Sequence, residues 1–145
     1  MLKEFNMLEA NPVSTPMTPG THAFTVSTLA RFGSNPGPVR WQAVKHLLRY
    51  IKGTMDYKIT YGPSPHPTAY LSFSDADYAG EIEGARSTSG WVILMGGGAV
   101  SWSSKLQTQV ARSTTESEYI AGESATREMA FFRHVLETKW NSLDP

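Results

Sequence analysis

Four acidic side chains fall within nine positions near the middle of the chain, and they are the residues best suited to chemistry. They are Asp75, Asp77, Glu81 and Glu83, with no basic residue before Arg86. If a strand continues through Asp77, then Asp75 and Asp77 project from one face of it, because side chains alternate along a strand. Two carboxylates so close repel each other unless a cation lies between them. Mg²⁺ is a natural candidate, since it prefers carboxylate oxygens.

A third carboxylate is predicted on a helix further along the chain. Glu118 lies seven residues before Ala125, so the helical repeat places it on the stripe that we expect to face the sheet. An acid on such a stripe needs a partner, and a shared metal ion would supply one. In the alternative interpretation, Asp75 and Asp77 form an ordinary turn, Glu116 is a helix cap, and the two glutamates after Asp77 belong to a solvated loop.

The elements that position these acids follow from periodicity and breakers. We expect a helix at residues 38–52, strands at Ala69–Ser74, Gly90–Met95 and Ala99–Ser103, and a long helix from about Thr114 to about Lys139. Three glycines, Gly96 to Gly98, permit a tight hairpin between the last two strands. The run Ser113 to Glu116 is a capping box that begins the long helix.

The first third of the chain has a different character. Residues 11–20 contain three prolines, which indicates a loop. Residues 31–58 hold six basic residues and one acid, so the predicted helix at 38–52 is basic as well as amphipathic. Such a helix is able to contact phosphates, although a basic helix face is more often only solvated. Tyr57–Tyr61 follows as a short segment with strand propensity.

Length and composition exclude several classes of protein. The chain has 145 residues, no cysteine, and thirteen basic against thirteen acidic residues. We therefore expect a single domain's worth of structure, no disulfide scaffold, no thiol nucleophile and no finger-type zinc site. Balanced charge gives no global attraction to nucleic acid. The longest apolar run is short, so we expect an intracellular protein with no membrane partner.

Several ordered blocks resemble one known family. The runs SDADYAGEIEGARSTSGW (Ser74–Trp91), GGGAVSWSSKLQ (Gly96–Gln107) and VARSTTESEYIA (Val110–Ala121) resemble the ribonuclease H domain of copia-type LTR retrotransposon polyproteins. Upstream, Ser34–Thr54 resembles the segment that connects the reverse transcriptase to that domain. The resemblance covers about residues 24–140.

The resemblance implies a fold and a division of the chain. We expect an α/β chain with an α+β mixed sheet in a partial ribonuclease H-like fold: three antiparallel strands and a long helix, preceded by the basic helix, with the last strands missing. Residues 1–37 would be an irregular remnant of the reverse transcriptase region, residues 38–56 the connecting helix, and residues 57–145 the truncated ribonuclease H-like domain.

The resemblance also implies an activity, which is hydrolysis of the RNA strand of RNA–DNA hybrids with two Mg²⁺ ions. Carried over by motif, the catalytic and metal-binding residues are Asp75 and Glu118. The expected partners are an RNA–DNA hybrid and the rest of a polyprotein or reverse transcriptase, and the expected locations are a cytoplasmic particle and the nucleus. Expected nucleic-acid contacts within the matching runs are Arg86, Ser87, Thr88 and Ser89.

The family uses four acids, and by the resemblance the other two would lie beyond Pro145. Two carboxylates would then face two divalent ions, which leaves half of the positive charge uncompensated. We therefore expect the chain as given to be inactive as a nuclease. The alternative is a non-catalytic retrotransposon remnant with at most weak nucleic-acid binding.

Overall fold

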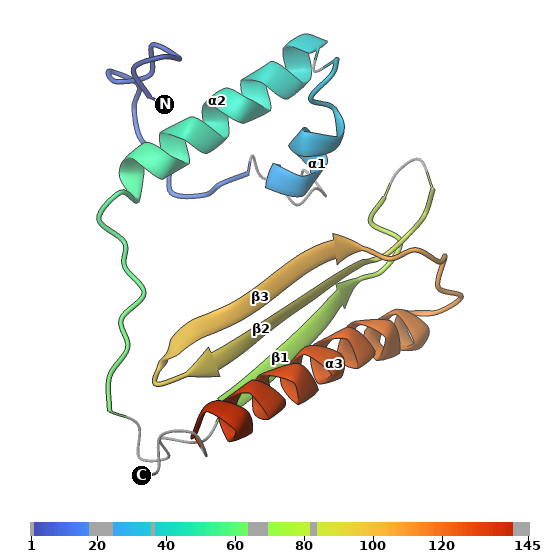
Figure 1. Ribbon diagram of the computed structural model, residues 1–145. Coiled ribbons are helices and arrows are strands. Elements are labelled where there is room, and N and C mark those ends of the chain that lie inside the picture. Colours follow the sequence, from blue (N-terminus) through green and yellow to red (C-terminus); the bar gives the residue numbers. More distant parts are fainter. Residues whose placement is uncertain (1, 18–24, 36, 64–69, 82–83, 141–145) are drawn as a thin grey trace. The chain divides into compact units, whose positions relative to one another are not determined.

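The computed structural model describes residues 2–17, 25–35, 37–63, 70–81 and 84–140. The chain divides into two compact units, Met1–Lys58 and Ile59–Pro145. The first unit contains helices α1 (Thr25–Arg31) and α2 (Gly37–Gly53), and the second contains a sheet and helix α3 (Thr114–Trp140) (Figure 1). None of the helices in the described residues is both long enough and apolar enough to cross a lipid bilayer.

Helix α2 forms where the sequence predicts it and organises the first unit. Its inward face buries Leu48, and Met7 of the N-terminal segment is buried as well. The ring of Phe5 packs on Trp41 with the ring centroids 5.8 Å apart. Helix α1 packs against α2 and was not predicted from the sequence. It has only seven residues, TVSTLAR, and its β-branched and hydroxyl side chains favour helix weakly.

The polar side chains of α2 bind the backbone of the N-terminal segment. Arg49 donates from Nε to the Asn11 carbonyl oxygen at 2.6 Å, and Lys52 donates from Nζ to the carbonyl oxygens of Leu8 and of Ala10, the latter at 3.0 Å. A segment outside regular structure needs such partners for its backbone groups. These two cations therefore hold the chain itself, which leaves fewer of the helix's charges available for phosphates.

The second unit is built on a three-stranded antiparallel sheet in the order β1-β2-β3. The strands are β1 (Tyr70–Asp77), β2 (Thr88–Met95) and β3 (Gly98–Leu106). With α3 they confirm the predicted α+β fold of three antiparallel strands and a long helix. Each strand overlaps its predicted range and extends beyond it, while Ala69, the predicted first strand residue, lies outside the described residues.

The hairpin between β2 and β3 turns at two glycines. Gly96 and Gly97 have φ angles of +58° and +79°, and Met95 pairs with Gly98 across the turn. Two successive positive φ values are the geometry of a type I′ turn, whose twist suits adjacent antiparallel strands. The predicted tight reversal is confirmed.

The segment Tyr57–Tyr61, which has strand propensity, does not form a strand. The following residues lie beside the hairpin turn instead: Gly62 N–H donates to the Gly96 carbonyl at 2.9 Å, and Tyr61 Oη donates to the Ala99 carbonyl at 2.7 Å. A Cβ built at Gly98 would lie 2.8 Å from the Tyr61 ring, so this close approach requires glycine there. Strand propensity alone does not make a strand where the segment forms no ladder of hydrogen bonds with a neighbouring strand.

Helix α3 covers one face of the sheet. Trp91 donates its indole N–H to Ser124 Oγ at 3.2 Å, and Ser101 Oγ donates to Glu128 Oε1 at 3.2 Å. Ile93 lies on the same sheet face, since it is two residues from Trp91, and it is fully buried. The second unit is therefore a two-layer arrangement of sheet and helix.

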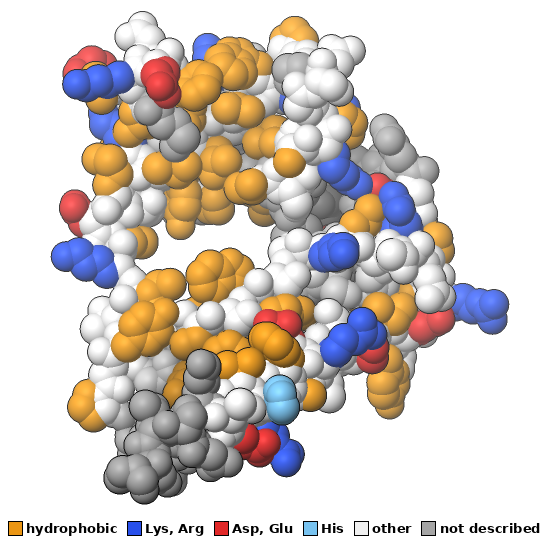
Figure 2. Space-filling model, in the orientation of Figure 1, with side chains coloured by type: hydrophobic (Ala, Val, Ile, Leu, Met, Phe, Trp, Pro, Cys, Tyr) orange, Lys and Arg blue, Asp and Glu red, His pale blue; other side chains and the backbone are white. Residues whose placement is uncertain are grey.

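The opposite sheet face carries an exposed apolar row. Phe73 pairs with Val92, and Val92 pairs with Trp102, so the three side chains lie side by side across the strands. The Phe73 and Trp102 side chains are 56% and 64% exposed. Among the described residues of this unit, no helix packs on this face. Apolar side chains are visible at the surface of both units in Figure 2.

Candidate metal and nucleic-acid site

The first pair of candidate acids lies at the C-terminal end of β1. The strand continues through Asp77, with Asp75 paired to Gly90 and Asp77 to Thr88, so the two aspartates share a face as the spacing predicted. Asp75 is exposed and Asp77 is half-buried. A Cβ at Gly80 would overlap the Asp77 carboxylate, so this side chain occupies space that only glycine leaves open.

Glu118 lies in the second turn of α3 and is exposed. The prediction that it faces the sheet is wrong, because Ser117 takes that place. Ser117 and Ala121 are fully buried and Ala125 is nearly so. The buried residues of the helix therefore recur every four positions. Rows of this kind run obliquely around a helix. An unpaired carboxylate in that row would lose its hydration, whereas a serine hydroxyl donates to the Thr114 carbonyl at 2.7 Å.

The structure brings Asp75 and Glu118 to the same end of the second unit. Helix α3 packs on β1 and β2 and runs antiparallel to β1, so its first turns lie beside the acidic end of that strand (Figure 1). A Cβ at Gly122, one turn after Glu118, would lie 3.9 Å from Ser74 Oγ. Since Ser74 faces the helix, alternation directs the Asp75 side chain to the other sheet face. The two carboxylates thus lie on adjacent elements but leave them in different directions.

These acids do not by themselves form a complete site for divalent ions. Within the described ranges, no three His, Asp or Glu side chains lie close enough together to hold a metal ion. Two carboxylates against two divalent ions leave a large uncompensated charge. The described residues therefore offer two candidate acidic ligands and not a full coordination set.

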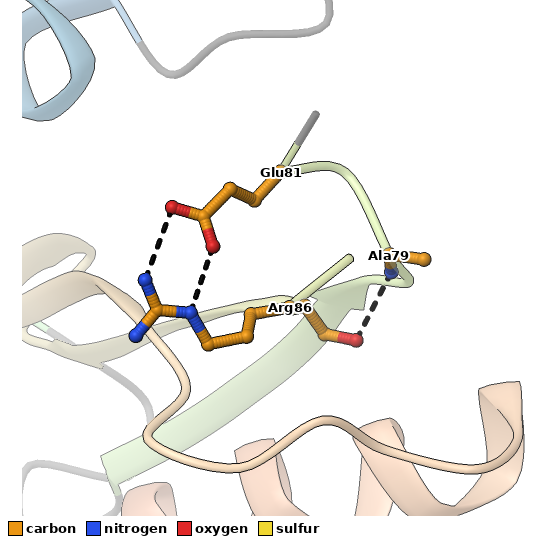
Figure 3. A network of polar contacts seen from close by, with 4 residues as sticks. Ala79, Glu81 and Arg86 are labelled. Atoms are coloured by element: carbon orange, nitrogen blue, oxygen red, sulfur yellow. Dashed lines mark hydrogen bonds and ion pairs between the residues drawn. The ribbon is translucent and has the colours of Figure 1, made fainter. Parts of the chain in front are cut away.

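The loop between β1 and β2 is closed by an ion pair. Arg86 donates to both carboxylate oxygens of Glu81, from Nε at 2.7 Å and from a terminal nitrogen at 3.2 Å (Figure 3). These hydrogen bonds raise the pKa of the Arg86 guanidinium above its ordinary value. The Glu81 N–H also donates to the Arg86 carbonyl at 3.1 Å. Glu81 was predicted to be solvated; its side chain is instead only 9% exposed, and Glu83 lies outside the described residues.

The hydroxyl groups predicted to contact nucleic acid are buried. Ser87, Thr88 and Ser89 are between 0% and 8% exposed. Ser87 Oγ accepts a hydrogen bond from the Ala79 N–H at 3.1 Å (Figure 3). Of the four predicted contact residues, Arg86 has the accessible side chain, with 39% of it exposed. The prediction of nucleic-acid contact stays a prediction, and this bond gives the Ser87 hydroxyl a structural role.

Sequence reasoning missed Gln107, which is 5% exposed. Its Nε2 donates to Ser89 Oγ at 2.9 Å and to the Ser117 carbonyl at 3.0 Å, and its backbone N–H donates to the Ser87 carbonyl at 2.8 Å. This side chain joins the sheet to the start of α3. The available signal was an amide directly after a strand, which is too common to distinguish a buried bridge from a surface residue.

The capping box at the start of α3 is present. The Glu116 N–H donates to Ser113 Oγ at 3.1 Å, while Glu116 Oε2 accepts from the Arg112 N–H at 2.6 Å. The glutamate reaches one residue further back than in the usual box. Glu116 is therefore a cap, as the alternative interpretation had it.

Curated proteins match most of the chain, and two of those described below are named as transposon polyproteins. A retrovirus-related Pol polyprotein from transposon TNT 1-94 of Nicotiana tabacum is 42% identical over 115 residues, which is 79% of this chain and 8% of that protein. The corresponding polyprotein from transposon RE2 of Arabidopsis thaliana is 32% identical over 168 residues, covering 94% of this chain and 12% of that protein. A Plasmopara viticola protein named secreted RxLR effector protein 161 is 47% identical over 107 residues, or 73% of this chain and 74% of that protein.

The similarities to the two transposon polyproteins support a retrotransposon-derived polyprotein region. The chain belongs to the same sequence family as the Plasmopara viticola protein, and it is similar to segments of the two transposon Pol polyproteins. It spans between 8% and 12% of the two transposon polyproteins described above. No family model matches the chain, and no solved structure matches it.

Proposed function

We propose that the second unit is the ribonuclease H region of a copia-type retrotransposon polyprotein and that the first unit includes its connection to the reverse transcriptase. The observation that carries the proposal is the placement of α3 across β1, which brings the helix turn with Glu118 to the acidic end of the strand with Asp75. The element order fits the proposal as well, since three antiparallel strands precede the helix.

The activity that we assign to the intact region is hydrolysis of RNA in an RNA–DNA hybrid, with Mg²⁺ as the cofactor. In this proposal Asp75 and Glu118 are two of the metal ligands, and further acids complete the set. In the residues that the structure describes, no three acids are arranged so that they could hold a metal ion. We therefore propose that this chain by itself binds metal weakly and does not turn over substrate.

The proposed partners are a hybrid duplex and the remaining parts of a polyprotein or reverse transcriptase. A hybrid is distinguished from DNA by its 2′-hydroxyl groups and by the shape of its minor groove. Arg86 is the proposed phosphate contact, because part of its guanidinium-bearing side chain remains accessible beside Glu81. The proposed locations are a cytoplasmic particle and the nucleus.

The second candidate is a non-catalytic remnant with weak nucleic-acid binding. The specific observation in its favour is that the two side chains point in different directions. Glu118 is exposed on α3, and Asp75 projects from the sheet face opposite to the helix. That arrangement leaves the pair without the third acid that a divalent ion usually needs.

Binding of a fluorescent RNA–DNA hybrid, with and without Mg²⁺, separates the two candidates. The wild-type chain is compared with Asp75→Asn, Glu118→Gln and the control Asp56→Asn, which removes an exposed acid of the first unit. The ribonuclease H proposal predicts Mg²⁺-dependent binding that the first two substitutions weaken and the control does not. Binding that is changed neither by Mg²⁺ nor by the two substitutions would support the non-catalytic remnant and overturn the assignment of the two metal ligands.

A further inference from the structure

We propose that Gln107 is a positioning residue, whose side-chain amide sets the separation between the acidic end of β1 and the second turn of α3. This inference rests on the proposed function for its consequence, because those two places carry Asp75 and Glu118. The geometry of the bridge stands on the structure alone.

The side-chain amide of Gln107 forms hydrogen bonds with one group in the sheet and one group in helix α3. Its Nε2 donates to Ser89 Oγ at 2.9 Å, and Ser89 pairs across the sheet with Ala76, the residue that follows Asp75. The same nitrogen donates to the Ser117 carbonyl at 3.0 Å, and Ser117 precedes Glu118. Each candidate acid is therefore one residue away from a position that this amide fixes.

The orientation of the amide is determined by its partners. The Ser117 carbonyl only accepts hydrogen bonds, so the nitrogen and not the oxygen of the Gln107 amide must face it. Both bonds are buried, where hydrogen bonds are stronger than in water and a missing partner costs more. The bridge is consequently rigid compared with a surface contact.

The other end of the amide argues against a space-filling role. Gln107 Oε1 is buried and has no hydrogen-bond partner among the described residues. Leaving a buried acceptor unpaired is unfavourable, and an apolar side chain of similar length would avoid this. The two donated bonds are the contribution that only the amide makes.

A distance measurement tests the inference, and the absence of cysteine from the chain makes it practical. Spin labels are attached at Tyr78→Cys, just after β1, and at Tyr119→Cys, next to Glu118; both tyrosines are exposed. Pulsed electron paramagnetic resonance then gives the distance distribution in the full chain. We expect a narrow distribution that becomes broader and shifts in Gln107→Met.

Two further variants keep the test decisive. Ser89→Ala removes the strand-side acceptor alone, so it gives the answer even where Gln107→Met does not fold, and we expect the same broadening. Ser72→Ala is the matched control, because its buried hydroxyl has no partner in the described residues, and we expect no change. An unchanged distribution in folded Gln107→Met and Ser89→Ala, with only a lower melting temperature, would overturn the positioning role.

A titration with Mn²⁺ connects the result to the proposed function. If the wild-type chain binds Mn²⁺ through Asp75, we expect Gln107→Met to weaken binding by about tenfold or more, as is typical for residues that orient metal ligands. Equal affinity in the two proteins would also overturn the positioning role. A wild-type chain that binds no Mn²⁺ counts against the proposed metal site, while the distance distributions still decide the role of Gln107.

Discussion

Trp91 of β2 donates its indole N–H to Ser124 of α3 at 3.2 Å, and this bond ties the central strand to the helix that crosses it. The indole is half-buried, so its N–H has few alternatives in water. Ser74 pairs with Trp91 in the sheet and lies below Gly122 of the same helix. The bond therefore fixes the helix over the part of β1 that leads into Asp75.

Removing the acceptor of this bond lowers stability. We expect Ser124→Ala to reduce the free energy of unfolding by about 1 kcal/mol, because a partly buried donor loses its partner. Urea unfolding followed by circular dichroism measures the change. Thr126→Ala is the control, since Thr126 is exposed and bonds only within its helix; a loss of equal size there would contradict the account of the Trp91 bond.

The cap at the start of α3 has a separate and measurable contribution. Ser113→Ala leaves the Glu116 N–H without its acceptor and is expected to cost about 1 kcal/mol. Thr115→Ala, at an exposed position of the first turn, is the matched control and is expected to be nearly neutral. Equal effects of the two substitutions would show that the serine is not the cap.

The loop between β1 and β2 holds an alanine in the left-handed region. Ala85 has a φ of +51°, a conformation that costs an L-residue about 1–2 kcal/mol and glycine much less. We expect Ala85→Gly to stabilise the chain by about 0.5 kcal/mol, after the greater entropy of unfolded glycine is subtracted. Ala130→Gly, in the exposed part of α3, has the opposite expected sign. A lower melting temperature in Ala85→Gly would contradict the backbone assignment.

The contribution of the ion pair between Arg86 and Glu81 to stability is expected to depend on the geometry of the contact. It is not expected to change with pH near neutrality. Arg86→Lys keeps the charge and loses the two-pronged contact, so we expect a lower melting temperature. The hydrogen bond to Glu81 raises the pKa of Arg86, so its stabilisation is lost only as pH rises through that raised value. The deficit of Arg86→Lys is therefore constant between about pH 7 and about pH 9.

The control for the ion pair is Arg127→Lys, whose partner Glu123 lies four residues earlier on exposed helix surface. Such surface pairs contribute little, so we expect no change. Thermal unfolding at several pH values measures both variants. A deficit in Arg86→Lys that varied over this range would show that another group controls the loop.

The sequence predicts the elements of this chain better than the contacts between them. The glycines at Gly96 and Gly97, the capping serine at Ser113 and the alternation through Asp77 are local signals, and each is confirmed. Tyr57–Tyr61 shows the limit of propensity, because a strand also needs a sheet edge to pair with. Helix α1 shows the converse limit, since packing against α2 supports a short helix whose first four residues, TVST, are weak helix formers.

For the candidate site as well, the sequence predicted the residues better than the contacts between them. Asp75 and Glu118 were selected from spacing and motif, and the structure places their elements side by side. The outward direction of Glu118 depends on which row of α3 meets the twisted sheet, and this is settled by packing rather than by a seven-residue step. Gln107 bridges groups that are 18 and 10 residues away in sequence, a relation that no local pattern expresses.

The most direct measurement is a calorimetric titration of the wild-type chain with Mg²⁺, repeated on Asp75→Asn, Glu118→Gln and the control Asp56→Asn. The account predicts weak, saturable binding that Asp75→Asn and Glu118→Gln each remove while the chain stays folded, and that Asp56→Asn leaves unchanged. Binding that survives both substitutions, or no binding by a folded wild-type chain, would contradict the assignment of Asp75 and Glu118 as metal ligands.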